Sequence, residues 1–376
     1  MRNKKKILRA VTSAQSLVFC RDVMVKMMAM GYDMVAVTSP GPELDSLRHD
    51  DGFHCVAVPM HRRISPVADL VSLVRLVIVM AKERPWVVHS MTPKAGLLCM
   101  IAAWLTGVPV RVHTFTGLVW PTATGLKRRL LMMTDRITCA CATHVIPEGK
   151  GVMYDLQHGG ITSKPMRVLG HGNVKGVDIE RFDPSRFGAQ AASGAFTFLF
   201  VGRIVGEKGI NELVEAFARL HEEQPATRLV LVGNYETELD PLSQGTRRTI
   251  DAMDAIETPG PKRGDDLVSA YAEADCFVMP SYREGFPNVV LEAGAMGLPS
   301  VVTDINGSRE IVENGKNGLV VPPRDAAALY DAMKLMATDN ETRQRMAREA
   351  RPMIVSRFEC GYVQRCQIEF YKDVMG

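Results

Sequence analysis

The sequence lacks the patterns of a disulfide framework and of a metal site. Its eight cysteines are scattered over positions 20, 55, 99, 139, 141, 276, 360 and 366, with no CxxC pair and no histidine at metal-ligand spacing. We therefore expect reduced thiols in a cytosolic protein, and no bound metal.

Long hydrophobic runs are also missing. The start, MRNKKKILRAVTSAQSLVF, is basic and then apolar, but Arg9 and Thr12 are among the polar residues that interrupt it before it reaches signal-peptide length. The most apolar stretch, residues 95–112, contains Pro109 and Arg111 and cannot supply the ~20 uninterrupted apolar residues of a transmembrane helix. We interpret the start as a first β-strand and expect no membrane-spanning helix.

A large excess of either charge is absent as well. The chain has 45 Lys and Arg against 42 Asp and Glu, a net charge of +3. Proteins that bind nucleic acid usually concentrate a far larger basic excess on one face, so we exclude nucleic acid as a partner. With 376 residues, 46% of them hydrophobic, the chain is long enough for two separate cores.

Short apolar runs alternate with longer helical patterns, which predicts parallel β-sheets covered by helices. The predicted strands of the first half are 6–11, 34–38, 53–58, 86–89, 110–114 and 143–146, with helices at 67–82 and 94–105. The second half repeats this rhythm with strands at 196–201, 228–232 and 276–279 and helices at 210–222, 247–255, 265–273 and 288–296. We therefore predict an α/β fold of two doubly wound sheets, with a ligand at the carboxyl ends of the strands in a cleft between two domains.

The segment 170–194 separates the two halves. It is rich in Gly, Pro, Asp and small polar residues and contains no periodic element, as is typical of a linker. We place the first domain at 1–175 and the second at 176–356. A C-terminal helix over 357–376 is expected to pack back on the first domain.

The first segment whose residues could bind a ligand or take part in catalysis is FLFVGRIVGEKGINELVEAF, residues 198–217. An apolar strand ends at Gly202, a glycine-rich loop carries Arg203 and Lys208, and an amphipathic helix follows. Two cations beside a helix N-terminus suit a diphosphate, although a solvated strand-to-helix connection has the same pattern. The segment is not a Walker loop, and no strand is followed by the GxGxxG of an NAD-dependent oxidoreductase.

The second such segment is SYREGFPNVVLEAGAMGLP, residues 281–299. We expect a turn at Pro287, Asn288 as the N-cap of a helix, and the amides that follow to be open to a phosphate. Glu292 lies one turn inside that helix and inclines toward its start, while Glu284 lies in the loop before it. Both carboxylates could accept hydrogen bonds from sugar hydroxyls, or they could simply stabilise the helix dipole.

The E-x7-E spacing of EGFPNVVLE resembles family 4 of the retaining glycosyltransferases, which adopt the GT-B fold of two facing Rossmann-like domains with a deep inter-domain cleft. The resemblance extends to GRIVGEKGINELVEAF, LVLVG (229–233), YAEADCFVMPS (271–281), GLPSVVTDINGSREIVENGKNGLVVPPRD (297–325) and the linker KGVDIERFDP (175–184). The first half is a weaker match over 61–70, 87–118 and 124–137. Those segments look like enzymes that build bacterial capsule, O-antigen or other lipid-linked glycans.

The resemblance implies roles for individual residues. Arg203 and Lys208 correspond to the cations that bind the donor diphosphate and stabilise the charge on the leaving group. Glu284 corresponds to the carboxylate that holds the transferred sugar, and Glu292 to the one that binds the ribose. The other residues expected at the donor are Ser16 in the loop after the first strand, Gly202, Arg263 in the loop against the base, and Gly285, Phe286, Pro287, Asn288 and Val289 at the helix start.

The sequence departs from the family pattern in its first half. A Gly-Gly pair is common in the first loop of the family, whereas this chain has Ala14, Gln15 and Ser16 there. A histidine of the family corresponds here to Thr116, in HTFTGL.

His113, three residues earlier, is our candidate for the catalytic role of that histidine. Its odd offset on a strand predicts that it points to the opposite face from Thr116. A structural histidine is the alternative for His113, and equally for His89, which ends a strand at the cleft.

The resemblance thus implies retaining transfer of a hexose or N-acetylhexosamine from a nucleotide sugar, in our prediction a UDP-sugar, to a lipid-linked or polysaccharide acceptor of bacterial surface glycan biosynthesis. No metal or other cofactor is expected, because cations and helix amides would neutralise the leaving group and no predicted strand ends in a DxD motif. A catalytically silent GT-B scaffold of a polysaccharide assembly complex and a nucleotide-sugar epimerase of the same architecture are the alternatives.

Basic residues stand beside apolar ones in four places of the first half: residue 2, 4–6, 61–63 and the predicted helix 126–133. Basic amphipathic segments adsorb to anionic membranes, so we predict peripheral contact with the cytoplasmic face of the inner membrane. A solvated basic helix face is the alternative.

Overall fold

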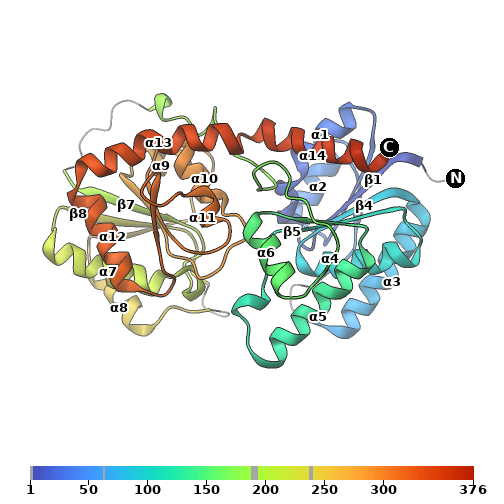
Figure 1. Ribbon diagram of the computed structural model, residues 1–376, viewed down its shortest axis with the longest axis horizontal. Coiled ribbons are helices and arrows are strands. Elements are labelled where there is room, and N and C mark those ends of the chain that lie inside the picture. The colour runs from blue at the N-terminus through green and yellow to red at the C-terminus, as the bar shows by residue number, and fades with distance from the viewer. Residues whose placement is uncertain (1–2, 62–63, 188–193, 237–239) are drawn as a thin grey trace. The chain divides into compact units, whose positions relative to one another are not determined.

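The computed structural model describes residues 3–61, 64–187, 194–236 and 240–376. The chain divides into two compact units, one made of Met1–Lys175 with Gly361–Gly376 and the other of Gly176–Cys360. Each unit contains one six-stranded parallel sheet with helices packed on it (Figure 1). The predicted α/β class with two doubly wound sheets is confirmed.

The sheet of the first unit has the strand order β3-β2-β1-β4-β5-β6. Its strands are β1 (Asn3–Ala10), β2 (Asp33–Thr38), β3 (His54–Ala57), β4 (Pro85–Met91), β5 (Val110–Phe115) and β6 (His144–Pro147). Neighbouring β1 residues are buried in different clusters: Ile7 packs with Met24 and Tyr371, and Leu8 packs with Leu76 and Cys99. Both faces of the sheet are therefore covered, which explains why the strands are apolar runs without polar alternation.

Two groups of helices cover these faces (Figure 1): α1, α2 and α14 on one, and α3, α4 and α5 on the other. The helices of this unit are α1 (Arg21–Ala29), α2 (Pro42–His49), α3 (Pro66–Glu83), α4 (Pro93–Leu105), α5 (Gly125–Cys141), α6 (Lys150–His158) and α14 (Cys360–Met375), with short 3-10 turns η1 (Ala14–Phe19) and η2 (Trp120–Thr122). None of the helices in the described part of the chain is long and apolar enough to span a membrane. All eight cysteines lie in described segments as free thiols, as predicted.

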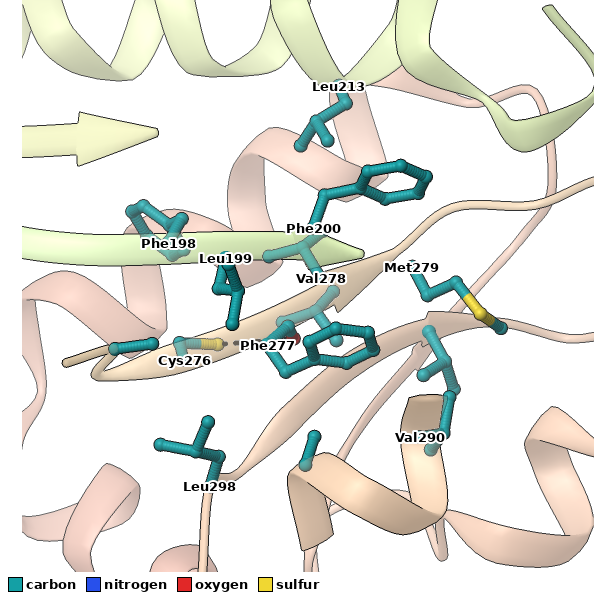
Figure 2. Close-up of a cluster of buried hydrophobic side chains, with 14 of the residues drawn as sticks. Phe198, Leu199, Phe200, Leu213, Cys276, Phe277, Val278, Met279, Val290 and Leu298 are labelled. Carbon is teal, nitrogen blue, oxygen red and sulfur yellow. Dashed lines mark hydrogen bonds between the residues drawn. The ribbon is translucent and has the colours of Figure 1, made fainter. Parts of the chain in front are cut away.

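The sheet of the second unit has the order β12-β11-β10-β7-β8-β9. Its strands are β7 (Phe196–Val201), β8 (Thr227–Val232), β9 (Ile256–Gly260), β10 (Cys276–Met279), β11 (Ser300–Thr303) and β12 (Gly318–Val321). Its helices are α7 (Ile210–Glu223), α8 (Gln244–Ala252), α9 (Gly264–Ala272), α10 (Asn288–Ala295), α11 (Ser308–Ile311), α12 (Ala326–Thr338) and α13 (Asn340–Phe358), with 3-10 turns η3 (Pro184–Arg186) and η4 (Gly206–Lys208). Figure 2 shows side chains of the central strands β7 and β10 in the core between these helices.

Three sequence expectations were wrong in detail. Strands β9, β11 and β12 were not predicted; β9 gives no apolar run because Glu257 and its neighbours are exposed at the sheet edge. Helix α8 begins at Gln244, three residues before the predicted start, because the Ser243 hydroxyl accepts the Thr246 N–H at 3.0 Å and caps it. The C-terminal helix begins at Cys360, since Glu359 is extended and ends α13.

Both sheets place their first and fourth strands side by side at the centre. In the first unit β1 pairs with β4, and in the second β7 pairs with β10. At such a pair the chain leaves the sheet in opposite directions, so the loops diverge and open a crevice at the carboxyl edge. This topological switch point is where a doubly wound sheet binds its ligand.

Candidate active site

The switch point of the second unit brings together the two segments singled out in the sequence. One loop leaves β7 through Gly202 to Lys208, and the other leaves β10 through Pro280 to Glu284. The backbone N–H of Tyr282 donates to the Glu207 carbonyl at 2.9 Å, which joins the two loops directly. Lys208 and Glu284, 76 positions apart in the chain, therefore share one site.

Gly209 allows this close approach. It has φ +72°, in the left-handed region, and a Cβ on it would lie 2.1 Å from the carbonyl oxygen of Pro280. A larger residue would meet both a backbone penalty and a clash. The glycine thus holds the Lys208 loop against the end of β10.

Lys208 and Glu284 form an ion pair through Nζ and Oε1. Their side chains are 18% and 16% exposed, so both are largely withdrawn from water without being sealed off. Since η4 ends at Lys208 and Glu284 lies in the β10 loop, the pair connects the two halves of the crevice. Glu284, predicted to hold the sugar, and Lys208, predicted to bind the diphosphate, are therefore in contact in the structure.

A second set of charges surrounds Glu207. Its carboxylate accepts from Arg203 at 2.7 Å and from Arg283 at 2.8 Å, and Arg203 also pairs with Glu236. Partial burial opposes ionisation of Glu207, but the two arginines outweigh it and hold the pKa of its carboxyl below the ordinary value. Arg203 is 51% exposed, so its guanidinium is accessible to a ligand.

Glu292 lies on α10, where a buried tyrosine fixes it. The hydroxyl of Tyr271 donates to its Oε2 at 3.0 Å. Burial and then the negative charge of Glu292 raise the pKa of Tyr271 well above its ordinary value, so the tyrosine stays a donor. The carboxylate is therefore held in one orientation at a partly exposed position.

The start of α10 differs by one residue from the prediction. Pro287 occupies the N-cap position and Asn288 is the first helical residue, so Asn288 is not the cap. The Val290 N–H donates to the Pro287 carbonyl at 3.1 Å, so that amide is already used inside the turn and is not open to a phosphate. Val289, between Asn288 and Val290, is partly exposed.

The preceding residues are packed tightly. Phe286 is 5% exposed and its ring lies 5.3 Å from that of Phe358. A Cβ on Gly307, which has φ +74°, would lie 2.3 Å from the Gly285 carbonyl oxygen. Gly285 and Phe286 are thus held in place from the loop after β11.

The remaining predicted donor residues lie further apart. Gly202 directly follows β7 and donates its N–H to the Val232 carbonyl at 3.0 Å. Arg263 is exposed at the start of α9, beyond the edge strand β9. Ser16 belongs to the first unit, where it lies in η1 and donates its N–H to the Ser13 carbonyl at 2.9 Å.

His113 and Thr116 line the same pocket of the first unit, which corrects the expectation that they point to opposite faces. Strand β5 ends at Phe115, so strict alternation does not reach Thr116. His113 is 1% exposed and bonds through Nδ1 to Ser90 Oγ at 2.9 Å. Burial lowers the pKa of His113 to about 3, which makes it a neutral group.

His89 is part of a separate buried network. Its Nδ1 lies 2.6 Å from the Tyr371 hydroxyl and also contacts Arg9, and its Nε2 lies 2.7 Å from Thr114 Oγ1. Burial, and then the charge of Arg9, lower the pKa of His89 well below its ordinary value. These satisfied contacts fit the structural alternative for His89.

Sequence reasoning gave no role to Arg283, Glu236 or Tyr271. Their partners are distant in the chain, and only folding brings them together. No cluster of three or more His, Cys, Asp or Glu side chains that could hold a metal ion occurs in the part of the chain that the structure describes.

Comparison with known proteins defines the class. Residues 17–172 match the family described as glycosyl transferase 4-like domain, and residues 182–353 match glycosyl transferases group 1. The chain is 31% identical to the capsular polysaccharide biosynthesis glycosyltransferase CapM of Staphylococcus aureus, over 95% of this chain and 94% of CapM. The chain belongs to the group 1 glycosyltransferases, family 4, and is an enzyme of that class with the GT-B fold.

Two further similarities are informative. An Escherichia coli UDP-Gal:α-D-GlcNAc-diphosphoundecaprenol α-1,3-galactosyltransferase is 30% identical over 85% of this chain and 83% of its own length. Among solved structures, Anabaena HepE in complex with UDP superposes with a TM-score of 0.79 at 18% identity, covering 98% of this chain and 100% of HepE. The last similarity supports the fold alone.

Proposed function

We propose that this enzyme transfers a hexose or N-acetylhexosamine from a UDP-sugar, with retention of configuration, to a lipid-linked or polysaccharide acceptor. The observation that carries the proposal is the Lys208–Glu284 pair at the switch point between β7 and β10. It sets a cation for the diphosphate beside a carboxylate that can accept hydrogen bonds from sugar hydroxyls. The names of the S. aureus and E. coli relatives support the acceptor class.

The charges of the site supply the chemistry. The donor diphosphate replaces Glu284 as the partner of Lys208, and the freed carboxylate turns to the sugar. As the bond to UDP breaks, Lys208 and Arg203 stabilise the negative charge that develops on the leaving phosphate. The acceptor hydroxyl attacks the anomeric carbon from the side on which UDP departs and passes its proton to the departing phosphate, so retention needs no nucleophilic side chain. Glu292, oriented by Tyr271, binds the ribose.

A donor screen tests the proposal. A UDP-sugar at about 100 times its Kd should stabilise the native state by about 2.7 kcal/mol, so Tm rises with UDP-sugars but not with GDP- or ADP-sugars. Slow hydrolysis of the same donor should accompany this shift. If none of the three donor classes shifts Tm or is hydrolysed, the chain is a silent scaffold of the same fold.

We also propose that the first unit contacts the inner membrane at its cytoplasmic face. On α5, Lys127, Arg128 and Arg129 are exposed beside Leu126, which is 80% exposed. On α3, the exposed apolar residues recur at helical spacing and are Val67, Leu70, Val71, Val74 and Ile78. Both helices pack against α4 and cover the same face of the sheet. Of the other basic positions predicted, residues 2, 62 and 63 lie outside the described part of the chain.

Such a surface combines both requirements of membrane adsorption, apolar area and positive charge. Each Lys or Arg near an anionic surface contributes about 1 kcal/mol, so replacing Lys127, Arg128 and Arg129 with Ala should weaken binding about 100-fold. Flotation with phosphatidylglycerol-containing liposomes measures this loss. Replacing Lys26, Arg348 and Lys372 with Ala removes the same charge elsewhere and should leave flotation intact. Unchanged flotation of the α5 variant would reject this surface.

A further inference from the structure

The loop after β8 runs beside the loop after β7 that carries the cations of the donor site. Near its start, the Asn234 carbonyl accepts the Ile204 N–H at 2.8 Å, and further along the Asp240 carbonyl accepts the Gly206 N–H at 3.3 Å. The Asp240 carboxylate also accepts the backbone N–H of Glu207. Two points of the loop after β8 are therefore fixed against the same stretch of chain.

Glu236 is placed by this arrangement. Its neighbour Tyr235 forms a parallel bridge with Ile204, and the guanidinium of Arg247 on α8 lies 4.3 Å from the centre of the Tyr235 ring. Glu236 follows directly, and its carboxylate pairs with Nη1 of Arg203. The side chains of Arg203 and Glu236 are 51% and 31% exposed, so a ligand can reach the pair from solvent.

The two carboxylates that hold Arg203 differ in their other contacts. Glu207 also binds Arg283 at 2.8 Å, and its backbone N–H donates to Asp240. In the ranges that the structure describes, Arg203 is the one cation paired with Glu236. A ligand that takes the place of Glu236 therefore breaks a single ion pair, whereas one that takes the place of Glu207 breaks two. Glu236 is thus the partner that gives way more easily.

The ion pairs of the donor site balance one another in charge. Their members are Arg203, Lys208, Arg283, Glu207, Glu236 and Glu284. Three positive charges thus face three negative ones while the pairs are intact. When Glu284 and Glu236 leave their partners, the three cations face Glu207 alone. That positive excess suits a diphosphate, because each of its phosphates carries negative charge.

We propose that Glu236 is an internal counterion of the donor site: the diphosphate of the donor displaces it from Arg203, and it returns to Arg203 when the nucleoside diphosphate product leaves. The inference rests on the proposed function, since it names a residue that sets the affinity of that same site for its nucleotide. The donor must break the Arg203–Glu236 pair in order to bind, so the pair lowers the affinity for donor and product alike. Release of the product is favoured for the same reason.

Replacing Glu236 with Gln should tighten nucleotide binding. Glutamine keeps the shape of the side chain but removes the charge that competes with phosphate for Arg203. The energy of an exposed ion pair corresponds to about a two- to fivefold change in an equilibrium constant, so Glu236→Gln should bind UDP about two- to fivefold more tightly than wild type. Isothermal titration calorimetry of the full chain with UDP measures this gain. An equal or weaker affinity would overturn the proposal, since a Glu236 that only held Arg203 in position would give that result.

Two controls show whether the gain depends on Arg203. Glu257→Gln breaks a surface ion pair of the same kind in the same unit, with Arg228 at 3.2 Å, and should bind UDP as wild type does. In an Arg203→Ala background, which itself binds UDP more weakly, Glu236→Gln should bring little further change, because the two residues act on the nucleotide as a pair. An equal gain without Arg203 would make Glu236 a general negative charge near the site and reject the proposal.

Parallel titrations with GDP and ADP separate this inference from the proposed function. If GDP or ADP binds in place of UDP and Glu236→Gln tightens its binding by the same factor, the UDP assignment fails and the role of Glu236 stands. If UDP binds and the variant shows no gain, the role of Glu236 fails and the UDP assignment stands. If wild type binds none of the three nucleotides, both proposals are wrong.

Discussion

Replacing Lys208 with Ala should lower kcat about 10²–10³-fold. The lysine supplies the positive charge that a departing UDP needs, and removing one such preorganised group typically costs about 3–4 kcal/mol of transition-state stabilisation. The loss of transition-state stabilisation should exceed the loss in free energy of unfolding, because the side chains of Lys208 and Glu284 are still partly exposed, at 18% and 16%. Steady-state transfer, or donor hydrolysis before the acceptor is known, measures it.

Two further variants define what the loss means. Lys316→Ala removes an exposed lysine of the same unit, paired with Glu313 at 3.1 Å, and should retain full activity. Glu284→Gln keeps the shape of the partner of Lys208 but cannot offer the sugar a charged acceptor, so it should also lower kcat. Near-normal turnover by Lys208→Ala would contradict the proposed roles of Lys208 at the leaving phosphate and of Glu284 at the sugar.

Replacing Gly209 with Ala should reduce both stability and activity. The left-handed φ of +72° costs a residue with a Cβ about 1–2 kcal/mol, and the contact at 2.1 Å from the Pro280 carbonyl forces the loop away from β10. We expect a total of roughly 2–4 kcal/mol in the free energy of unfolding. Because the loop also positions Lys208, a shift of about 1 Å should cost about 10²-fold in kcat.

Gly315 offers a matched control for this effect. It has φ +78° in the same unit, but a Cβ there would have no atom within 4 Å. Gly315→Ala should therefore show the backbone penalty alone, a fall in Tm of a few degrees with normal kcat. Thermal unfolding and kinetics of both variants test the difference. Equal Tm and kcat for Gly209→Ala and Gly315→Ala would mean that the close contact of Gly209 with Pro280 affects neither stability nor activity.

The central strands could be predicted from the sequence because they are buried on both faces. Strands β7 and β10 have the predicted bounds, since their apolar runs end where the loops begin. The edge strand β9 escaped prediction because only one of its five residues is fully buried. The break between α13 and α14 escaped it too, because one extended residue, Glu359, leaves little trace in a helical pattern.

The charged residues of the donor site could be named in advance, but not their partners. Their motifs predicted Lys208 and Glu284 separately, and only the pairing of β7 with β10 makes them neighbours.

The division of the chain has a consequence for biosynthesis. The second unit is continuous and can complete its core as soon as Cys360 has left the ribosome, whereas the first unit needs Gly361–Gly376. The hydroxyl of Tyr371 on α14 accepts a hydrogen bond from Arg9 and shares another with Nδ1 of His89, and Phe370 lies in the same core. The half that is synthesised first is therefore finished last. The part of its sheet face that α14 covers would be exposed throughout translation, so nascent chains should depend on chaperones that shield it.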